Sequence, residues 1–439
     1  MNTRKNMETG FAKFLRKTTE YLIYLFIFIL PWQTKFIFQP GETNYSEISL
    51  YFSHALLLLI LILFLGQHAR EKECDNECRL VLYSLLALVF FSLVSIFFAP
   101  DKVLAFYHYF IILSGLSLFF IVRSGTMPRS YQDPLLDKIY VVYSFLAGVF
   151  LQAMLGIYQF LTQSTFACKY LGLAVHDPAT LGTAVIETAS GRWLRAYGGL
   201  DHPNILGGVL VISLIFAAYL LAKKKMLNSR QQVWSSVLLF VFYFVALYAL
   251  FFTFSRSAWL ALLIGFIVLL IVFIINKDKW ILGRFLALIV FSIFLVTLAT
   301  LPFQDLVFTR INVQTRLEQK SITERLSYIP EAKGLLQNHV LTGVGVGNYS
   351  QALSLKDGNK KAAWDYQPVH NSFLLILVEN GLFAFLSFFV FIFFLIRNGR
   401  REMFVFPIMA ALLVLMMFDH WLISLPFGIL FLSLLLGLI

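Results

Sequence analysis

Residues 233–275 decide the fold, and they read VWSSVLLFVFYFVALYALFFTFSRSAWLALLIGFIVLLIVFII. Two apolar runs lie on either side of Ser255 and Ser257, and Arg256 is the only charged residue in the whole stretch. An apolar run of about 20 residues has the length of a helix that crosses the hydrocarbon of a membrane. A backbone in lipid must also satisfy its own hydrogen bonds, which favours a helix. The stretch therefore predicts two membrane-spanning helices joined by a short turn.

The rest of the chain has the same character. Hydrophobic residues make up 59% of the 439 residues and charged residues 13%, whereas soluble domains have about 45–50% and about 25%. We therefore predict an all-α integral membrane protein of about 12 transmembrane helices. The candidate spans are 19–38, 48–65, 80–98, 103–122, 139–161, 204–222, 233–254, 257–275, 284–301, 372–396, 403–418 and 422–439. The last two are short, and a single re-entrant hairpin is the alternative for them.

The basic residues indicate the orientation of these spans. Of the 35 lysines and arginines, 21 fall in the N-terminal segment and in the connections on its side of the membrane, and three fall in the short opposite connections. Because positive residues favour the cytoplasmic side, we predict a cytoplasmic N-terminus. The remaining eleven lie in two long loops, 162–203 and 302–371, which face outward in this topology. The basic residues behind the net charge of +11 lie between the spans and not on one face of a soluble domain. They therefore indicate contact with membrane lipids and no binding of nucleic acid.

Two arginines are candidates for binding an anion. Arg256 lies between two spans at the outer surface, and a guanidinium matches phosphate oxygens bidentately. The alternative is a side chain that merely snorkels to the membrane surface. In the second long loop, Ser321 and Glu324 form a capping box, which predicts a helix beginning there. Apolar residues recur at helical spacing after it, so we predict an amphipathic helix on the membrane surface that carries Arg325 on its flank; a solvated helix charge is the alternative.

The loop ends at His370, immediately before a long apolar span. Asn371 or Ser372 can cap the following helix, so these two residues have a structural reason to be there. The histidine has none, and an imidazole titrates near neutral pH. We therefore predict that His370 acts as a general base toward a hydroxyl group.

Three further features have structural and functional alternatives. Glu379 lies inside the span after His370, where it either pairs within the bundle or faces a wet cavity. Asp419 and His420 separate the last two spans and are either an interfacial turn or supporting site residues. Residues 343–348 are rich in glycine like a phosphate-binding loop, but no βαβ unit accompanies them, so we predict a turn. No cluster has the ligand spacing of a metal site, so we predict no metal and no cofactor.

Taken together, these motifs resemble the bacterial O-antigen ligases and their relatives, the lipid-linked polysaccharide polymerases and O-oligosaccharyltransferases. The resemblance extends from Arg195 to the C-terminus. It rests on RAYGGLDHPN (195–204), FSRSAW (254–259), ERL (324–326), GVGVGNY (343–349), HNSF (370–373), ENG (379–381) and FDH (418–420).

The resemblance implies a GT-C-like all-α fold in the bacterial inner membrane, with its site facing the periplasm. It implies that Arg256 and Arg325 hold the diphosphate of an undecaprenyl-diphosphate-linked glycan and that His370 is the base. Arg195 resembles a substrate-binding position of the polymerase branch. The implied reaction inverts the anomeric carbon and transfers the glycan to a hydroxyl group.

The acceptor stays open at this point. Lipid A core would make the protein a ligase, a growing glycan would make it a polymerase, and a protein serine an oligosaccharyltransferase. The lack of a large soluble C-terminal domain favours the first two. A flippase that moves lipid-linked sugars is the alternative of another class, although such transporters place polar residues near the bilayer midplane.

Overall fold

A computed structural model describes residues 10–41, 45–68, 76–127, 134–189, 191–223, 230–312, 315–358, 360–362 and 365–439. Among them, eight helices are long and apolar enough to cross a membrane. They are α3 (Asn76–Ser95), α4 (Lys102–Thr126), α5 (Lys138–Thr162), α6 (Pro203–Lys223), α7 (Arg230–Thr253), α8 (Arg256–Asn276), α9 (Lys279–Thr300) and α13 (Ser372–Gly399). The predicted all-α membrane fold is confirmed.

The remaining predicted spans also fall on helices, which are α1 (Gly10–Ile29), α2 (Phe52–His68), α14 (Val405–Phe418) and α16 (Pro426–Leu438). Helices α14 and α16 have only 14 and 13 residues, with the single turn α15 (Trp421–Ser424) between them. A Cβ atom on Gly399 would lie 2.6 Å from Ile439, so the end of α16 returns to the end of α13. The last two predicted spans are thus two antiparallel helices that meet at residues 419–425.

The first predicted span, 19–38, is wrong at its C-terminal end. Helix α1 ends at Ile29, and Pro31 follows, because proline cannot donate the hydrogen bond that would continue the helix. Residues Lys35–Gln39 form strand β1 instead, antiparallel to β2 (Ile48–Tyr51), with Lys35 opposite Tyr51. Neither strand was predicted.

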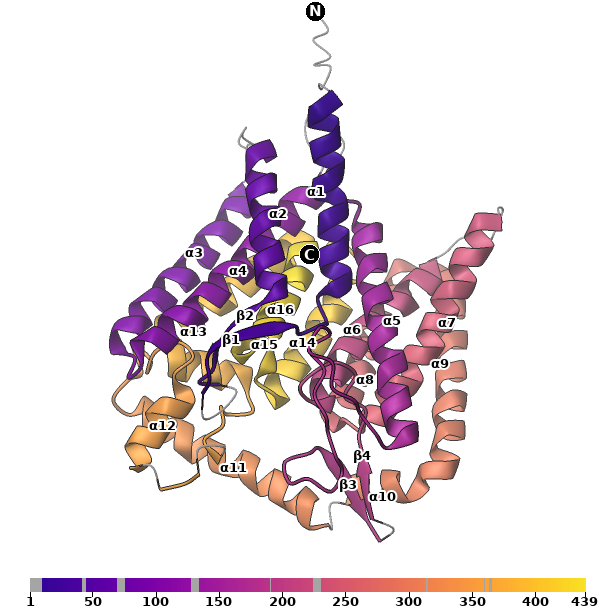
Figure 1. Ribbon diagram of the computed structural model, residues 1–439. Helices are drawn as coiled ribbons and strands as arrows, with labels where there is room; N and C mark the ends of the chain where they lie inside the picture. The colour runs from indigo at the N-terminus through magenta and orange to yellow at the C-terminus, as the bar shows by residue number, and fades with distance from the viewer. Residues whose placement is uncertain are drawn as a thin grey trace, which may run out of the picture.

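The two long loops lie at the same end of the molecule, opposite the N-terminus (Figure 1). The first carries the hairpin of β3 (Val185–Thr188) and β4 (Gly191–Leu194), and the second carries α10 (Gln304–Asn312), α11 (Arg316–Leu336) and α12 (Tyr349–Asp357). Single 3-10 turns, η1 (Ile96–Phe98) and η2 (Leu301–Phe303), follow α3 and α9.

Helix α11 begins at Arg316, with Thr315 as its N-cap, and not at Ser321 as predicted. Residues 316–320 are mostly strong helix formers, and the buried Glu318 side chain fixes this first turn to α10. The predicted apolar stripe of the helix is exposed, at 38% for Ile322, 63% for Leu326 and 56% for Ile329. An exposed stripe of this kind suits a helix that lies against lipid.

Helix α6 forms the centre of the bundle and is buried along almost its whole length. It packs against α5, α7, α8, α9 and α14, while α3 packs on α13 and α4 packs on α16. Because α6 begins immediately after the first long loop and α8 begins at Arg256, the N-terminal ends of these two core helices place polar residues from several parts of the sequence close together.

Candidate active site

His370 is the second residue before α13, and the residue between them caps the helix. The side chain of Asn371 accepts a hydrogen bond from the backbone N–H of Leu374 at 2.9 Å, which confirms the predicted cap. This cap fixes the direction in which the chain enters α13, and so fixes the position of the preceding imidazole. The His370 side chain keeps 24% of its surface exposed.

Asp419 lies directly beside His370. Its Oδ1 atom is 3.4 Å from Nδ1 of His370, and the hydroxyl of Ser372 donates to its backbone carbonyl at 2.7 Å. Burial acts to raise the pKa of the Asp419 carboxyl, but the interaction with His370 and the charges of His420 and His202 together hold that pKa below its usual range. Asp419 is therefore a carboxylate, and it faces one nitrogen of His370 while Nε2 is left for another partner.

His420 is close to His370 but differs from it in environment. The two ring centroids are 4.9 Å apart, and Nδ1 of His420 is 2.7 Å from Oγ of Ser424. Burial, followed by the charge of His370, lowers the pKa of His420 to about 3, although Asp419 opposes this. His420 is therefore neutral at neutral pH. The ring of Tyr45, from the turn between β1 and β2, lies edge-on to it at 5.6 Å.

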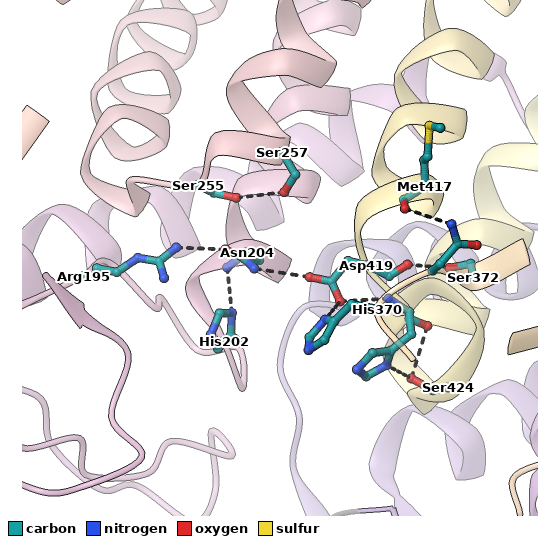
Figure 2. A network of polar contacts seen from close by, with 12 residues as sticks. Arg195, His202, Asn204, Ser255, Ser257, His370, Ser372, Met417, Asp419 and Ser424 are labelled. Carbon is teal, nitrogen blue, oxygen red and sulfur yellow. Dashed lines mark hydrogen bonds and ion pairs between the residues drawn. The ribbon is translucent and has the colours of Figure 1, made fainter. Parts of the chain in front are cut away.

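A chain of polar contacts leads from Asp419 to the first long loop (Figure 2). The side-chain amide of Asn204, in the first turn of α6, donates to Oδ2 of Asp419 at 3.3 Å. The Oδ1 atom of the same amide accepts from Arg195 Nη2 at 2.8 Å. Arg195 thus reaches His370 only through Asn204 and Asp419, and its own side chain is buried.

The turn between α7 and α8 holds two guanidinium groups. The backbone carbonyl of Thr253 accepts from Nε of Arg195 at 2.7 Å, and the carbonyl of Phe254 accepts from Nη2 of Arg310 at 2.8 Å. Carbonyls at a helix C-terminus carry partial negative charge and attract cations. Arg256 is the first residue of α8, and partial positive charge develops at that terminus. The turn therefore concentrates positive charge at one place.

Glu318 is the carboxylate that balances this charge. Its Oε2 atom is 3.0 Å from Nη2 of Arg256, and its Oε1 atom pairs with Arg310. The Glu318 side chain is only 4% exposed, whereas that of Arg256 is 30% exposed. One buried carboxylate thus bridges two arginines, and Arg256 keeps a surface that another anion can contact.

Arg325 extends the same positively charged region toward His370. Its charge and that of Arg256 both act on Arg310, and no hydrogen bond or salt bridge holds it within the described ranges. Tyr328 follows one turn later on α11, and its ring centroid is 5.5 Å from that of His370. Arg256 and Arg325 are therefore both close enough to Arg310 for their charges to act on it, and His370 lies against Tyr328 of the helix that carries Arg325.

Glu379 lies apart from this group and holds the glycine-rich loop. Its two carboxylate oxygens accept from the backbone N–H groups of Gly347 at 3.0 Å and Tyr349 at 3.2 Å. Gly347 has a φ of 69°, and a Cβ atom there would lie 2.1 Å from the ring of His108. The loop is the predicted turn. Its backbone N–H groups do bind an acidic side chain, but that side chain is Glu379 of the same chain.

One cluster of the described residues has the composition of a metal site. His370, Asp419 and His420 each offer a ligand atom, and these atoms lie within 4.8 Å of one another. Histidine nitrogens and a carboxylate oxygen suit zinc and related ions. The expectation of metal-free chemistry therefore stays a prediction that requires a chelation experiment.

Residues 241–389 match the family model Wzy_C, described as O-antigen ligase. This segment is similar to the O-antigen ligase family. The match confirms the resemblance stated from the motifs and supports a glycosyltransferase of the O-antigen ligase and polymerase type. The O-antigen ligase segment contains Arg256, Arg310, Glu318, Arg325 and His370, whereas Asp419 and Arg195 lie outside it. No curated protein and no solved structure matches the chain.

Sequence reasoning missed Arg310 and Glu318, which both precede the ERL motif (324–326) in the second long loop. It also missed Asn204 and Tyr45. Asn204 ends the quoted stretch 195–204 and so was within reach. Tyr45 lies in the β1–β2 hairpin, which was not predicted, and it belongs to none of the motifs quoted from the sequence. Arg310 and Glu318 differ from the other charges of the second loop only in being buried, which the sequence of a polar loop does not reveal.

Proposed function

We propose that this protein is a glycosyltransferase of the periplasmic face of the bacterial inner membrane. It would transfer a glycan from undecaprenyl diphosphate to an acceptor hydroxyl, with inversion and without a metal ion. The observation that most supports the proposal is an accessible imidazole, that of His370, which faces the Asp419 carboxylate and contacts Tyr328 on the helix that carries Arg325. The match of residues 241–389 to the O-antigen ligase family supports the same reaction type.

The arginines are suited to the diphosphate. Arg256 and Arg325 would bind the diphosphate, as the resemblance implies. The positive charge of the buried Arg310 would add to theirs. Three cations face one carboxylate, Glu318, so the region keeps excess positive charge even before substrate binds. A diphosphate oxygen would contact the part of the Arg256 guanidinium that Glu318 leaves exposed. Donors fixed before reaction stabilise charge on a leaving group without reorganisation.

His370 is suited to the acceptor hydroxyl. Because Nδ1 faces Asp419, Nε2 would take the hydroxyl proton. The acceptor oxygen would form a bond to the anomeric carbon while the bond from that carbon to the diphosphate oxygen breaks. The bonding electron pair leaves with the diphosphate, which the arginines stabilise. Asp419 would stabilise the imidazolium that forms, and Arg195 would hold Asp419 in place through Asn204.

Glu379, Asp419 and His420 receive different roles in this proposal. Asp419 positions the base, and His420 forms a neutral wall of the site because its pKa is about 3. Glu379 maintains the glycine-rich loop and does not take part in the chemistry.

Reconstitution into vesicles with a labelled undecaprenyl-diphosphate glycan tests the proposal. Lipid A core, a lipid-linked glycan and a serine peptide would compete as acceptors, and the labelled product would identify the acceptor. We expect lipid A core to be labelled, with free undecaprenyl diphosphate released in equal amount. Label on the second acceptor would identify a polymerase, and label on the peptide an oligosaccharyltransferase. Movement of intact donor across the bilayer with no label transferred would identify a flippase and overturn the proposal.

A further inference from the structure

A second, polar cavity lies beside the candidate active site. It has a volume of about 270 Å³, which is close to the lower end of the ~300–1000 Å³ of small-molecule sites. Its walls come from the β1–β2 hairpin, from α4, from both ends of the first long loop and from residues 424–426. None of these segments belongs to the part of the chain that matches the O-antigen ligase family.

Two side chains, Ser424 and His420, separate the cavity from the proposed base. Ser424 lines it, and Oγ of Ser424 is 2.7 Å from Nδ1 of His420, whose ring is 4.9 Å from that of His370. Asp201 lines the other side and precedes His202. A molecule that fills the cavity would therefore lie on the far side of His420 from His370.

The charges of the cavity differ from those of the arginine cluster. No arginine is among its lining residues in the described part of the chain, and Nζ of Lys35 is paired with Glu47 at 2.6 Å. Asp201 is accessible to solvent in the cavity, and no hydrogen bond or salt bridge among the described residues engages its carboxyl group. Enclosure by protein raises the pKa of this carboxyl, which Lys35 opposes and Glu47 reinforces. A phosphate group would find no free cation here.

The remaining lining groups suit a sugar. Tyr51 and Tyr107 present aromatic rings, which supply rigid apolar surface next to a polar group. The hydroxyl of Tyr107 is already used, since it donates to the carbonyl of Ser49 at 2.8 Å. The Asp201 carboxyl can accept hydrogen bonds from ligand hydroxyls. Aromatic walls with a few oriented polar groups are typical of sites for small uncharged ligands.

We propose that this cavity binds an uncharged saccharide unit of the acceptor glycan, through the Asp201 carboxyl and the ring of Tyr51. The inference rests on the proposed function, because it takes the arginine cluster as the diphosphate site and His370 as the base. It adds a specificity: the acceptor sugar unit held in the cavity carries no phosphate.

Direct binding tests the cavity independently of transfer. The detergent-solubilised full chain is titrated calorimetrically with neutral trisaccharides of glucose, galactose, mannose and N-acetylglucosamine, and with the 6-phosphorylated form of each. We expect at least one neutral trisaccharide to bind and its phosphorylated form to bind at least ten-fold more weakly. Asp201→Asn should weaken binding of the neutral trisaccharide about ten-fold, as expected for the loss of one hydrogen bond to a charged group.

Matched control variants distinguish an effect on the cavity from a general effect of substitution on the protein. Asp305→Asn removes an exposed carboxylate of α10, and Tyr170→Ala removes a ring that is 77% exposed outside the cavity. Both variants should bind the neutral trisaccharide as tightly as the native chain does. Tyr51→Ala should weaken this binding, as Asp201→Asn does. Failure of every neutral trisaccharide to bind, or equal binding of the phosphorylated forms, would overturn the inference.

Transfer kinetics assign the saccharide to the acceptor. Asp201→Asn should raise the KM for the acceptor with the donor KM unchanged, and a rise confined to the donor KM would overturn the assignment. If binding follows the expected pattern but the native chain transfers no glycan, the proposed function fails and the saccharide site stands. If transfer occurs but Asp201→Asn changes neither binding nor the acceptor KM, the saccharide site fails alone.

Discussion

Oδ1 of Asp419 lies 3.4 Å from Nδ1 of His370, at the point where the chain between α14 and α16 passes the start of α13. A carboxylate in this position orients an imidazole and stabilises its protonated form. It also determines which nitrogen is available, because only Nε2 is left for a substrate proton. The predictions about the base follow from this pair.

Replacement of His370 by alanine should abolish transfer. A general base contributes about 10²- to 10⁴-fold to a rate, so we expect at least a hundred-fold fall in kcat with labelled donor in vesicles. Donor binding should stay measurable, because the arginines are unchanged. His339→Ala, which removes an imidazole from the same loop away from the site, is the control. A stably folded His370→Ala variant with full activity would exclude His370 as the base.

Asp419→Asn should lower kcat by about 10²-fold, toward the lower limit for an impaired general base. Asparagine keeps the shape of the side chain but removes the charge that stabilises the imidazolium. The donor KM should change little, since Asp419 does not face the arginines. Double substitution of Asp419 and His370 tests the coupling: if the two losses simply multiply, the residues act independently and the proposed pair is wrong.

Arg256→Lys should reduce transfer despite the retained charge. A guanidinium can bind Glu318 and a phosphate oxygen together, whereas an ammonium group lacks this planar fork. We expect a loss of about 10- to 100-fold in kcat/KM, the scale of a missing donor at a developing charge. Arg316→Lys, on an exposed part of α11, should behave like the native chain. Unchanged kinetics in Arg256→Lys would mean that the side chain only snorkels.

Glu379→Gln should affect stability more than catalysis. The substitution replaces a carboxylate that accepts two backbone hydrogen bonds, and a hydrogen bond to a charged group contributes about 1.5–3 kcal/mol. We expect a lower midpoint of thermal unfolding and a kcat within ten-fold of native. Glu402→Gln breaks an exposed salt bridge with Lys138 and should leave the midpoint unchanged. If Glu379→Gln keeps the native midpoint but loses activity, Glu379 belongs to the active site.

Transfer should persist in excess EDTA. The arginines stabilise the leaving group and His370 accepts the proton, so no step of the proposed mechanism needs a divalent ion. The measurement is the initial rate before and after chelation. If activity is lost and returns with added metal, His370, Asp419 and His420 are the first candidates for the ligands.

The sequence was sufficient to predict the membrane-spanning helices. Apolar runs of the right length predicted every spanning helix, and the polar residues between runs, such as Arg256 and His370, are those that we propose form the site. This works because lipid imposes one strong length requirement on each span. The strand β1 was missed for the same reason, since its Phe36 and Phe38 look like the end of an apolar span.

The partners within the site could not be predicted. Asp419 reaches His370 only because two short helices bring residues 419–425 to the start of α13, and Glu318 reaches Arg256 only through the fold of the second loop. Neither of these two contacts produces a periodic pattern in the sequence. Burial is what distinguishes Arg310 from the other basic residues of its loop, and burial depends on the tertiary structure.

The shortness of α14 and α16 determines how a substrate can enter. A helix of 14 residues rises about 21 Å, whereas the hydrocarbon layer is about 30 Å thick. With the start of α14 at the opposite membrane surface, Asp419 and His420 at its other end would lie below the level of the lipid headgroups. In the proposed reaction, a donor with an isoprenoid tail would place its phosphates there without leaving its leaflet, by moving sideways between helices. The proposed acceptor would extend down from the aqueous side, so the two reactants would approach along perpendicular routes.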